Sequence, residues 1–243
     1  MACAAPCARG DTSDRATVAV ILPALNEEAS VGDVIQAVPS AVVDDVIVVD
    51  NGSTDRTAEM ARLAGARVVR QPRRGYGAAC MAGVLASASD VLVFLDADGS
   101  FDGGEIPALI DPLCAGRADL VLGSRRLGQV SPGAMPAHQR FGNDLTAALL
   151  RAFFGLQVTD LGPFRAIRRS DLLTLHMSEM TYGWPTEMMV KAARLRYRVV
   201  EVPVRYRQRL GGQSKVSGNL IASLKAGWHI LKVVWRHATY IRE

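Results

Sequence analysis

The stretch DVLVFLDADGS, residues 90–100, joins a run of apolar residues to two carboxylates, Asp96 and Asp98. A continuous apolar run is typical of a strand that is covered on both faces of a parallel sheet. Side chains alternate along a strand, so the two carboxylates point the same way only where the strand opens into a loop. Like charges repel unless a cation lies between them. The stretch therefore predicts a buried strand that ends at a cation site or, more simply, at a turn.

The same kind of strand recurs through the first half of the chain. Further candidates are TVAVILP (17–23), DVIVVD (45–50), ARVVR (66–70) and DLVLGS (119–124). Helix-like segments lie between them, near 30–38, 54–64, 77–88 and 104–115. This alternation predicts an α/β fold with a mostly parallel, doubly wound, Rossmann-like sheet and right-handed crossovers. Ligands of such sheets bind beyond the carboxyl ends of the strands.

The second half is less regular, and we expect it to form a C-terminal elaboration. A helix is predicted near 139–154, a strand within RYRVVEVPVRYRQR (196–209) and a closing helix near 219–237. No Gly-, Pro- or Ser-rich linker separates the halves. We expect a flexible N-terminal tail (1–16), one domain (17–218) and an amphipathic basic C-terminal helix (219–243).

Composition and charge narrow the function. With 49% hydrophobic residues the chain can bury a large core, and its net charge is only +4. Residues 191–243 nevertheless hold 12 Lys and Arg against two acids, while residues 1–190 hold 16 against 22. Such asymmetry is typical of a surface that meets phosphates, although a solvated face would look the same. The chain has no Walker loop, no GxGxxG after a strand and no GxSxG, which disfavours ATPases, dehydrogenases and serine hydrolases.

Polar clusters follow four consecutive predicted strands: PALNEE, DNGSTD, QPRRGYGAA and DADGS. Turns alone do not require repeated carboxylates at strand ends. Mg²⁺ and Mn²⁺ prefer carboxylate oxygens and keep positions open for substrate phosphates. Asp96 and Asp98 are therefore candidate ligands of Mg²⁺ or Mn²⁺, which would offset charge on a diphosphate leaving group.

The motifs PALNEE, VVDNGSTD, RGYGAA, FLDADGS and VLGSR, in this order, resemble the family 2 glycosyltransferases of GT-A fold. The later GPFRAIRR, GWPTEMMVKAA and GGQSKVSG are similar to the branch of dolichyl-phosphate (polyprenyl-phosphate) mannose and glucose synthases. The resemblance covers about residues 17–235. It implies a nucleotide-sugar site formed by Pro23, Ala24, Asn26, Glu27, Asp50, Asn51, Gly52, Gly75, Tyr76, Gly77, Asp96, Ala97 and Asp98.

The acceptor side of such an enzyme explains the basic residues. A lipid phosphate is already ionised near neutral pH, so it needs no strong base, but the enzyme must hold two anions close together. In relatives with a hydroxyl acceptor, an acid in this region would act as a base, whereas Asp160 could here equally position an Arg or contact the sugar hydroxyls. We assign Asp96, Asp98, Asp160, Arg125 and Lys215 to catalysis. Candidates for binding the acceptor or diphosphate are Arg125, Arg140, Arg165, Arg207, Arg209, Ser214 and Lys215.

The C-terminal segment carries apolar residues at helical spacing from Ile221 to Trp235 with basic residues alongside. This pattern is typical of a helix on a membrane surface and equally of one packed on the protein core. We expect no signal peptide, because the N-terminal segment has no basic n-region and no continuous apolar h-region. We therefore expect a cytoplasmic protein, or one peripheral at the inner face of the membrane through residues 219–243. A membrane partner subunit or homo-oligomer would fit, whereas a nucleic-acid partner would not explain the acidic strand ends.

The sequence thus predicts a metal-dependent, inverting transfer of mannose or glucose from a GDP- or UDP-sugar to a polyprenyl or dolichyl phosphate. Two alternatives stay open. One is transfer to a soluble or other lipid hydroxyl acceptor. The other is a non-catalytic subunit that binds a nucleotide sugar, although intact DADGS and GGQSK motifs argue against it.

Overall fold

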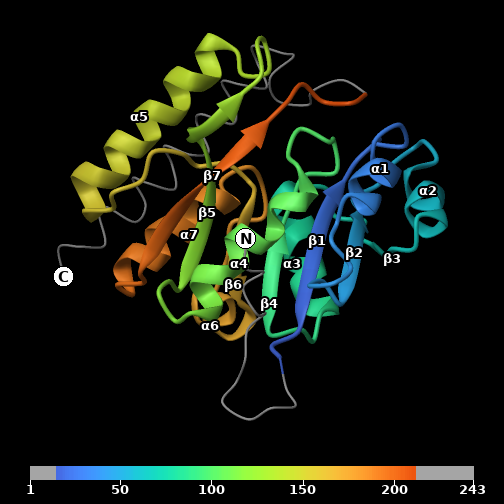
Figure 1. Ribbon diagram of the computed structural model, residues 1–243, viewed down its shortest axis with the longest axis horizontal. Coiled ribbons are helices and arrows are strands. Elements are labelled where there is room, and N and C mark those ends of the chain that lie inside the picture. The colour runs from blue at the N-terminus through green and yellow to red at the C-terminus, as the bar shows by residue number, and fades with distance from the viewer. Residues whose placement is uncertain (1–14, 212–243) are drawn as a thin grey trace.

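The computed structural model describes residues 15–211, and the strands within this range form one seven-stranded sheet (Figure 1). Its order is β3-β2-β1-β4-β6-β5-β7. The strands are β1 (Val18–Ala24), β2 (Asp45–Asp50), β3 (Arg67–Arg70), β4 (Val91–Phe94), β5 (Leu120–Val130), β6 (Arg165–Arg168) and β7 (Val199–Tyr206).

The sheet is mostly parallel, as predicted. β1 pairs in parallel with β2 and β4, β2 with β3, and β5 with β7. β6 is the exception, because it runs antiparallel between β4 and β5. The sequence did not indicate β6, since this strand has only four residues and an arginine at each end, Arg165 and Arg168. Its insertion separates β5 from β4 and so widens the edge on which the strand ends meet.

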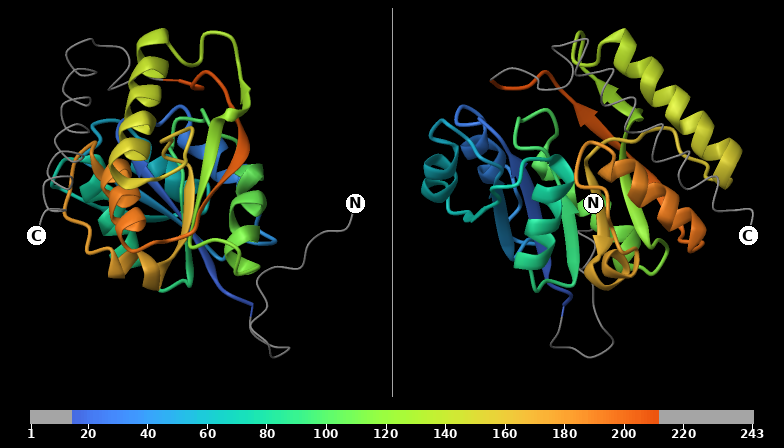
Figure 2. Two further views of the ribbon diagram at one scale, coloured as in Figure 1. Left: turned by 90° about the vertical axis from the view of Figure 1, so that its left-hand side faces the viewer. Right: turned by 180° about the vertical axis from the view of Figure 1, so that it is seen from behind.

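Helices cover both faces of the sheet (Figure 2). They are α1 (Val31–Gln36), α2 (Thr57–Leu63), α3 (Tyr76–Ala86), the 3₁₀ turn η1 (Gly103–Glu105), α4 (Ile106–Cys114), α5 (Ala137–Phe154), α6 (Arg169–Thr174) and α7 (Trp184–Arg194). Alternation along β1 shows the division, because Val20 belongs to the core that includes residues of α1, α2 and α4, while Ile21 belongs to the core that includes residues of α3, α5, α6 and α7. Both side chains are fully buried. The result is a three-layer α/β/α arrangement with two apolar cores.

The close contact between α3 and the sheet depends on a glycine. A Cβ at Gly83 would lie 2.4 Å from a methyl carbon of Ile21, so any larger residue would push the helix away from β1. α3 follows β3 after the short segment 71–75. Its tight packing therefore fixes where Gly75 and Tyr76 stand relative to the ends of β1 and β2.

Several predicted features fall outside the described residues: most of the tail, the closing helix 219–237, Ser214 and Lys215. Arg15 and Ala16, which we expected in the tail, pack on the sheet: Ala16 is 8% exposed, and Arg15 forms an ion pair with Asp44. Between residues 15 and 211, the structure contains no helix that is long and apolar enough to cross a membrane.

Candidate active site

A cavity of about 1060 Å³ opens where the carboxyl ends of the parallel strands meet. It brings together residues from the ends of β1, β2, β4, β5 and β7, which lie far apart in the sequence. The predicted site residues that line it are Pro23, Ala24, Glu27, Asn51, Gly75, Tyr76, Asp96, Ala97, Asp98, Arg125, Arg207 and Arg209. Ligand binding at this edge is what the doubly wound topology predicts.

The two carboxylates after β4 face this cavity. Tyr76 donates its hydroxyl to Asp96 over 3.4 Å, and the backbone and hydroxyl of Ser100 donate to Asp98 over 2.9 and 2.6 Å. Burial, and then the charge of Asp98, raises the pKa of Asp96 to about 7. Neutral Asp96 thus relieves a repulsion that a bound cation would also relieve.

A divalent cation fits this pair. Among residues 15–211 no group of three or more Asp, Glu, His or Cys side chains could hold a metal. Mg²⁺ and Mn²⁺ do not require such a group, because one or two carboxylates suffice when substrate phosphates and water complete the octahedron. Asp96 and Asp98 are therefore suited to a metal that arrives with a phosphorylated ligand.

Arg209 lies between two of the cavity carboxylates. Its guanidinium is 2.7 Å from Glu27 and 3.6 Å from Asp98. Burial tends to lower the pKa of Arg209, but Asp98 and Glu27 outweigh it and raise that pKa. Arg209 therefore stays charged beside the candidate metal ligands, where it can also meet an anion. Arg207 lines the same cavity and is bound to Asp102 at 2.7 Å.

Other residues of the predicted nucleotide site shape the loops instead of lining the cavity. Asn26 has a positive φ of 53° and accepts a hydrogen bond from the Thr54 backbone at 2.8 Å. Asp50 accepts one from the Ser53 backbone at 2.9 Å and is 8% exposed. Gly52, with φ 86°, belongs to the same turn. Asp50 and Gly52 thus shape the turn after β2, and Asn26 ties the end of β1 to it.

Asn51 does both, because it lines the cavity and holds a loop. Its amide nitrogen donates to the carbonyls of Gln71 and Arg73 at 2.9 and 2.8 Å, and its oxygen accepts from the Gly75 backbone at 2.8 Å. All three bonds tie the end of β2 to the segment that leads into α3. Asn51 therefore has little hydrogen-bonding capacity left for a ligand.

The glycines of RGYGAA are required by the protein itself. A Cβ at Gly75 or Gly77 would lie 2.3 Å from the carbonyl oxygen of Met180 or Glu179. The backbone of Gly77 donates to Thr181, and that of Ala78 to Met180. The resemblance places both glycines in the nucleotide-sugar site. In the structure, Gly77 lies outside the cavity lining and makes room for the 179–181 segment.

Three of the predicted phosphate-binding or catalytic residues lie elsewhere. Arg165 is 1% exposed and donates to backbone carbonyls, among them Pro185 at 3.0 Å. Arg140 is exposed on α5 and donates to the Met135 carbonyl. Asp160 is fully buried and bound to Arg125. Burial lowers the pKa of Arg165, whose guanidinium hydrogen bonds within residues 15–211 do not include one to a carboxylate.

Glu187, the other carboxylate in a motif position, is also consumed by protein contacts. It is 1% exposed and accepts bonds from Ser178, the Glu179 backbone and Lys191. Burial alone would raise the pKa of Glu187, but these donors outweigh it and lower that pKa. The side chain therefore anchors the segment before α7 and does not line the cavity.

Several residues that line the cavity were not among the predicted site residues. Tyr206, at the end of β7, lies with its ring centroid 5.1 Å from the Arg125 guanidinium carbon and 4.9 Å from the Phe101 ring. Arg74 donates to the Gly52 carbonyl at 2.9 Å. Tyr182 is 41% exposed at the cavity rim. An aromatic residue inside a basic strand, as in VRYRQR, was the one signal that could have indicated Tyr206.

Comparison with known proteins identifies the family. Residues 19–175 match the family model described as glycosyl transferase family 2. The chain belongs to this family. An uncharacterized glycosyltransferase of Mycobacterium tuberculosis (strain H37Rv) is 44% identical over 217 residues, which cover 89% of this chain and 97% of that protein. A dolichyl-phosphate hexose transferase of Haloferax volcanii is 36% identical over 200 residues, or 80% of this chain and 84% of that one.

A solved structure also resembles this family 2 glycosyltransferase. It is glucosyl-3-phosphoglycerate synthase from Mycobacterium tuberculosis in complex with Mn²⁺, UDP and glucosyl-3-phosphoglycerate. The TM-score is 0.74 at 27% identity, and the match covers 92% of this chain and 80% of that one. The glycosyltransferase described here thus has the mostly parallel GT-A sheet that its sequence predicted.

Proposed function

We propose that this family 2 glycosyltransferase moves a hexose from a nucleotide diphosphate sugar to a polyprenyl phosphate. The distribution of carboxylates carries the proposal. Within residues 15–211, the carboxylates that line the cavity are Glu27, Asp96 and Asp98, all on the side of β1 and β4. The two motif carboxylates of the other side, Asp160 and Glu187, are buried and bound by protein donors.

The donor would lie over the first strand ends. Pro23, Ala24 and Gly75 form an apolar and backbone surface there that suits a nucleoside. Asp96 and Asp98 would hold Mg²⁺ or Mn²⁺, which when bound offsets the charge on the departing diphosphate. Arg209, already held between Glu27 and Asp98, can offset the negative charge that develops on the diphosphate as its bond to the sugar breaks.

The acceptor needs no base from the protein. The second pKa of a phosphate monoester is about 6, so its oxygen is already a nucleophile at neutral pH. A phosphate oxygen forms the bond to the anomeric carbon while the bond to the nucleotide diphosphate breaks, and the electron pair leaves with the diphosphate. One such in-line displacement inverts the anomeric centre. Arg125, which lines the cavity, would bind the attacking phosphate.

A second candidate rests on the structural neighbour, which was solved with glucosyl-3-phosphoglycerate. A small phosphorylated acceptor could bind Arg125 through its phosphate and attack the anomeric carbon through a hydroxyl. That reaction would require a base for the hydroxyl proton. The buried, fully engaged state of Asp160 and Glu187 therefore favours the phosphate nucleophile.

The test is a matrix of donors and acceptors. The purified protein with Mn²⁺ would be offered UDP- and GDP-glucose or -mannose, each with polyprenyl phosphate in detergent or with 3-phosphoglycerate. We expect a hexosyl polyprenyl phosphate of inverted anomeric configuration, scored by mass and NMR, and no product in EDTA. Transfer to 3-phosphoglycerate alone would establish the second candidate. Donor binding without transfer to any acceptor would favour a non-catalytic subunit.

A further inference from the structure

Asp160 holds Arg125 by three of its nitrogen atoms. One carboxylate oxygen accepts from the Arg125 backbone at 2.7 Å and from Nε at 2.8 Å, and the other accepts from Nη2 at 2.7 Å. The second oxygen also accepts from the Leu161 backbone at 2.8 Å. This two-pronged geometry locks the plane of the guanidinium. Nη1 is the nitrogen that Asp160 does not engage.

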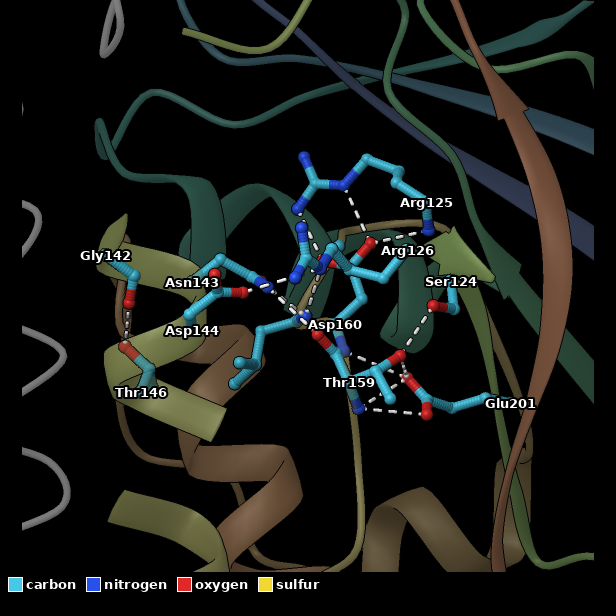
Figure 3. Close-up of polar contacts among 12 residues, drawn as sticks. Ser124, Arg125, Arg126, Gly142, Asn143, Asp144, Thr146, Thr159, Asp160 and Glu201 are labelled. Atoms are coloured by element: carbon cyan, nitrogen blue, oxygen red, sulfur yellow. Dashed lines mark hydrogen bonds and ion pairs between the residues drawn. The ribbon is translucent and has the colours of Figure 1, made fainter. Parts of the chain in front are cut away.

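Asp160 itself belongs to a short loop, residues 159–161, that is anchored on three sides (Figure 3). From β7, the Glu201 carboxylate accepts from the Thr159 backbone at 2.9 Å, the Asp160 backbone at 2.9 Å and the Thr159 hydroxyl at 3.0 Å. From β5, the Ser124 hydroxyl lies 2.8 Å from the Thr159 hydroxyl. The loop therefore cannot shift without breaking charge-assisted hydrogen bonds.

The third anchor comes from α5. Asn143 is 9% exposed; its amide nitrogen donates to the Thr159 carbonyl at 3.0 Å and its oxygen accepts from the Leu161 backbone at 3.0 Å. The side chain thus pairs with the loop backbone as a neighbouring strand would. α5 is joined to the sheet at the very loop that carries Asp160.

We infer that Glu201 and Asn143 are positioning residues that act through Asp160 to set the guanidinium of Arg125 for the phosphate of the acceptor. The inference rests on the proposed function for its ligand. Neither Glu201 nor Asn143 lines the cavity, so neither can touch the substrate directly. The path is continuous, since Glu201 and Asn143 bind the loop, the loop carries Asp160, and Asp160 binds Arg125.

Two observations indicate that this path serves a ligand and does more than hold the fold together. Arg125 is 12% exposed at the cavity, whereas its partner Asp160 is fully buried, so the pair presents one charged edge outward. The guanidinium carbon of Arg125 also lies over the Tyr206 ring, 5.1 Å from its centroid, so the ring supports one face of the group that Asp160 binds at its edge. A displacement of about 1 Å in such a group can cost about a hundredfold in rate.

The experiment compares Glu201→Gln and Asn143→Ala with Asp119→Asn. Asp119 is the matched control, because it too accepts bonds from a backbone and a side chain, both of Arg198, but it lies just before β5, at the strand end away from the cavity and from Arg125. We expect the KM for polyprenyl phosphate to rise by about tenfold in both positioning variants. The donor KM should change by less than about twofold, and the control should match the wild type in both constants.

A variant that only loses stability would show lower activity, but its KM would not rise for polyprenyl phosphate alone. The decisive measurement is therefore made in an Arg125→Ala background. There Glu201→Gln should no longer change the acceptor KM, although it should still lower Tm. Equal effects of Glu201→Gln in both backgrounds, or an unchanged acceptor KM in the single variants, would overturn the inference.

A binding assay that needs no turnover separates a failure of the proposed function from a failure of the positioning role. Inorganic phosphate would be titrated by calorimetry into the protein with Mn²⁺ and UDP. We expect binding that depends on Arg125 and that weakens by about tenfold in Glu201→Gln and Asn143→Ala. If the wild type transfers nothing to polyprenyl phosphate yet this pattern holds, the proposed acceptor is wrong and the positioning role stands. Phosphate binding that is equal in all variants would contradict the role itself.

Discussion

The two sides of the cavity use carboxylates in opposite ways. On the β4 side, Asp96 and Asp98 face the cavity, and burial together with mutual repulsion raises the pKa of Asp96 to about 7. On the β5 side, Asp160 receives four hydrogen bonds and is fully buried. Asp96 and Asp98 repel each other when both are ionised, whereas Asp160 is neutralised by the guanidinium of Arg125.

This difference assigns distinct tasks to similar residues. A carboxylate pair whose members repel each other when both are ionised is suited to a cation that binds and leaves with a ligand. A carboxylate saturated by an arginine is unsuited to accept a proton from a substrate, but it can hold that arginine in place. Counting acidic residues in motifs would treat Asp96 and Asp160 alike, whereas their hydrogen-bond partners separate them.

The largest effect should come from the metal side. Asp98→Ala removes a charge that would bind the cation, and we expect transfer to fall by about a thousandfold or more, because such a metal contributes several kcal/mol. The measurement is release of nucleotide diphosphate with Mn²⁺ and acceptor present. Asp33→Asn, on the exposed face of α1, is the control and should keep wild-type activity. Full activity of Asp98→Ala would remove this carboxylate from the metal site.

The buried pair gives the next effect. Asp160→Asn leaves the Arg125 charge without its partner, and we expect a loss of about 3 kcal/mol in the free energy of unfolding, measured with urea. Arg125→Met combined with Asp160→Leu should recover much of that stability, because no buried charge then remains, but should not recover transfer. Transfer by the double variant at the wild-type rate would show that this pair is purely structural.

The pKa of Asp96 predicts a pH dependence for the metal-free protein. The folded-state pKa of about 7 lies above the 3.8 of an unperturbed Asp. The protonated carboxyl therefore contributes stability that is fully present below about pH 4 and is lost as pH rises through 7. Because metal binding needs the ionised form, affinity for Mn²⁺ with UDP should increase by about tenfold from pH 6 to 8, with proton release on binding. Calorimetry measures both quantities, and a flat profile would contradict this shift.

The smallest effect should come from the exposed neighbour of the buried pair. Arg126 and Asp144 lie 3.5 Å apart and are 47% and 48% exposed. Water screens such a pair, so Asp144→Ala should change the free energy of unfolding by less than about 0.5 kcal/mol. Urea unfolding beside Asp160→Asn measures the contrast directly. A loss as large as that of Asp160→Asn would show that burial is not what separates the two pairs.

Much of the fold could be read from local patterns. The strands near 17–23, 45–50 and 119–124 were visible because continuous β-branched runs are specific to buried parallel strands. β6 and α7 were missed for the opposite reason. The four-residue β6 contains two arginines, and α7 buries the polar Thr186 and Glu187 in its first turn, so the buried face of neither element is purely apolar.

Part of the candidate site could be predicted in the same way. Asp96, Asp98 and Arg125 were indicated by motifs at strand ends, and all three line the cavity. Arg165 and Asp160 came from equally specific motifs and lie outside it. A motif reports that a side chain matters, but whether it meets a ligand or another side chain depends on neighbours that arrive from distant parts of the chain.

The sequence by itself determined the layer order, the family and the presence of a carboxylate pair after DVLVFL, because strand periodicity and strand-end chemistry are local properties. Only the tertiary structure decided which charges remain available. Glu201 is 41 residues from Asp160 along the chain, yet its hydrogen bond to the Asp160 backbone helps to place Arg125. Burial and pairing of charges depend on contacts across the sheet, and no spacing within a single segment encodes them.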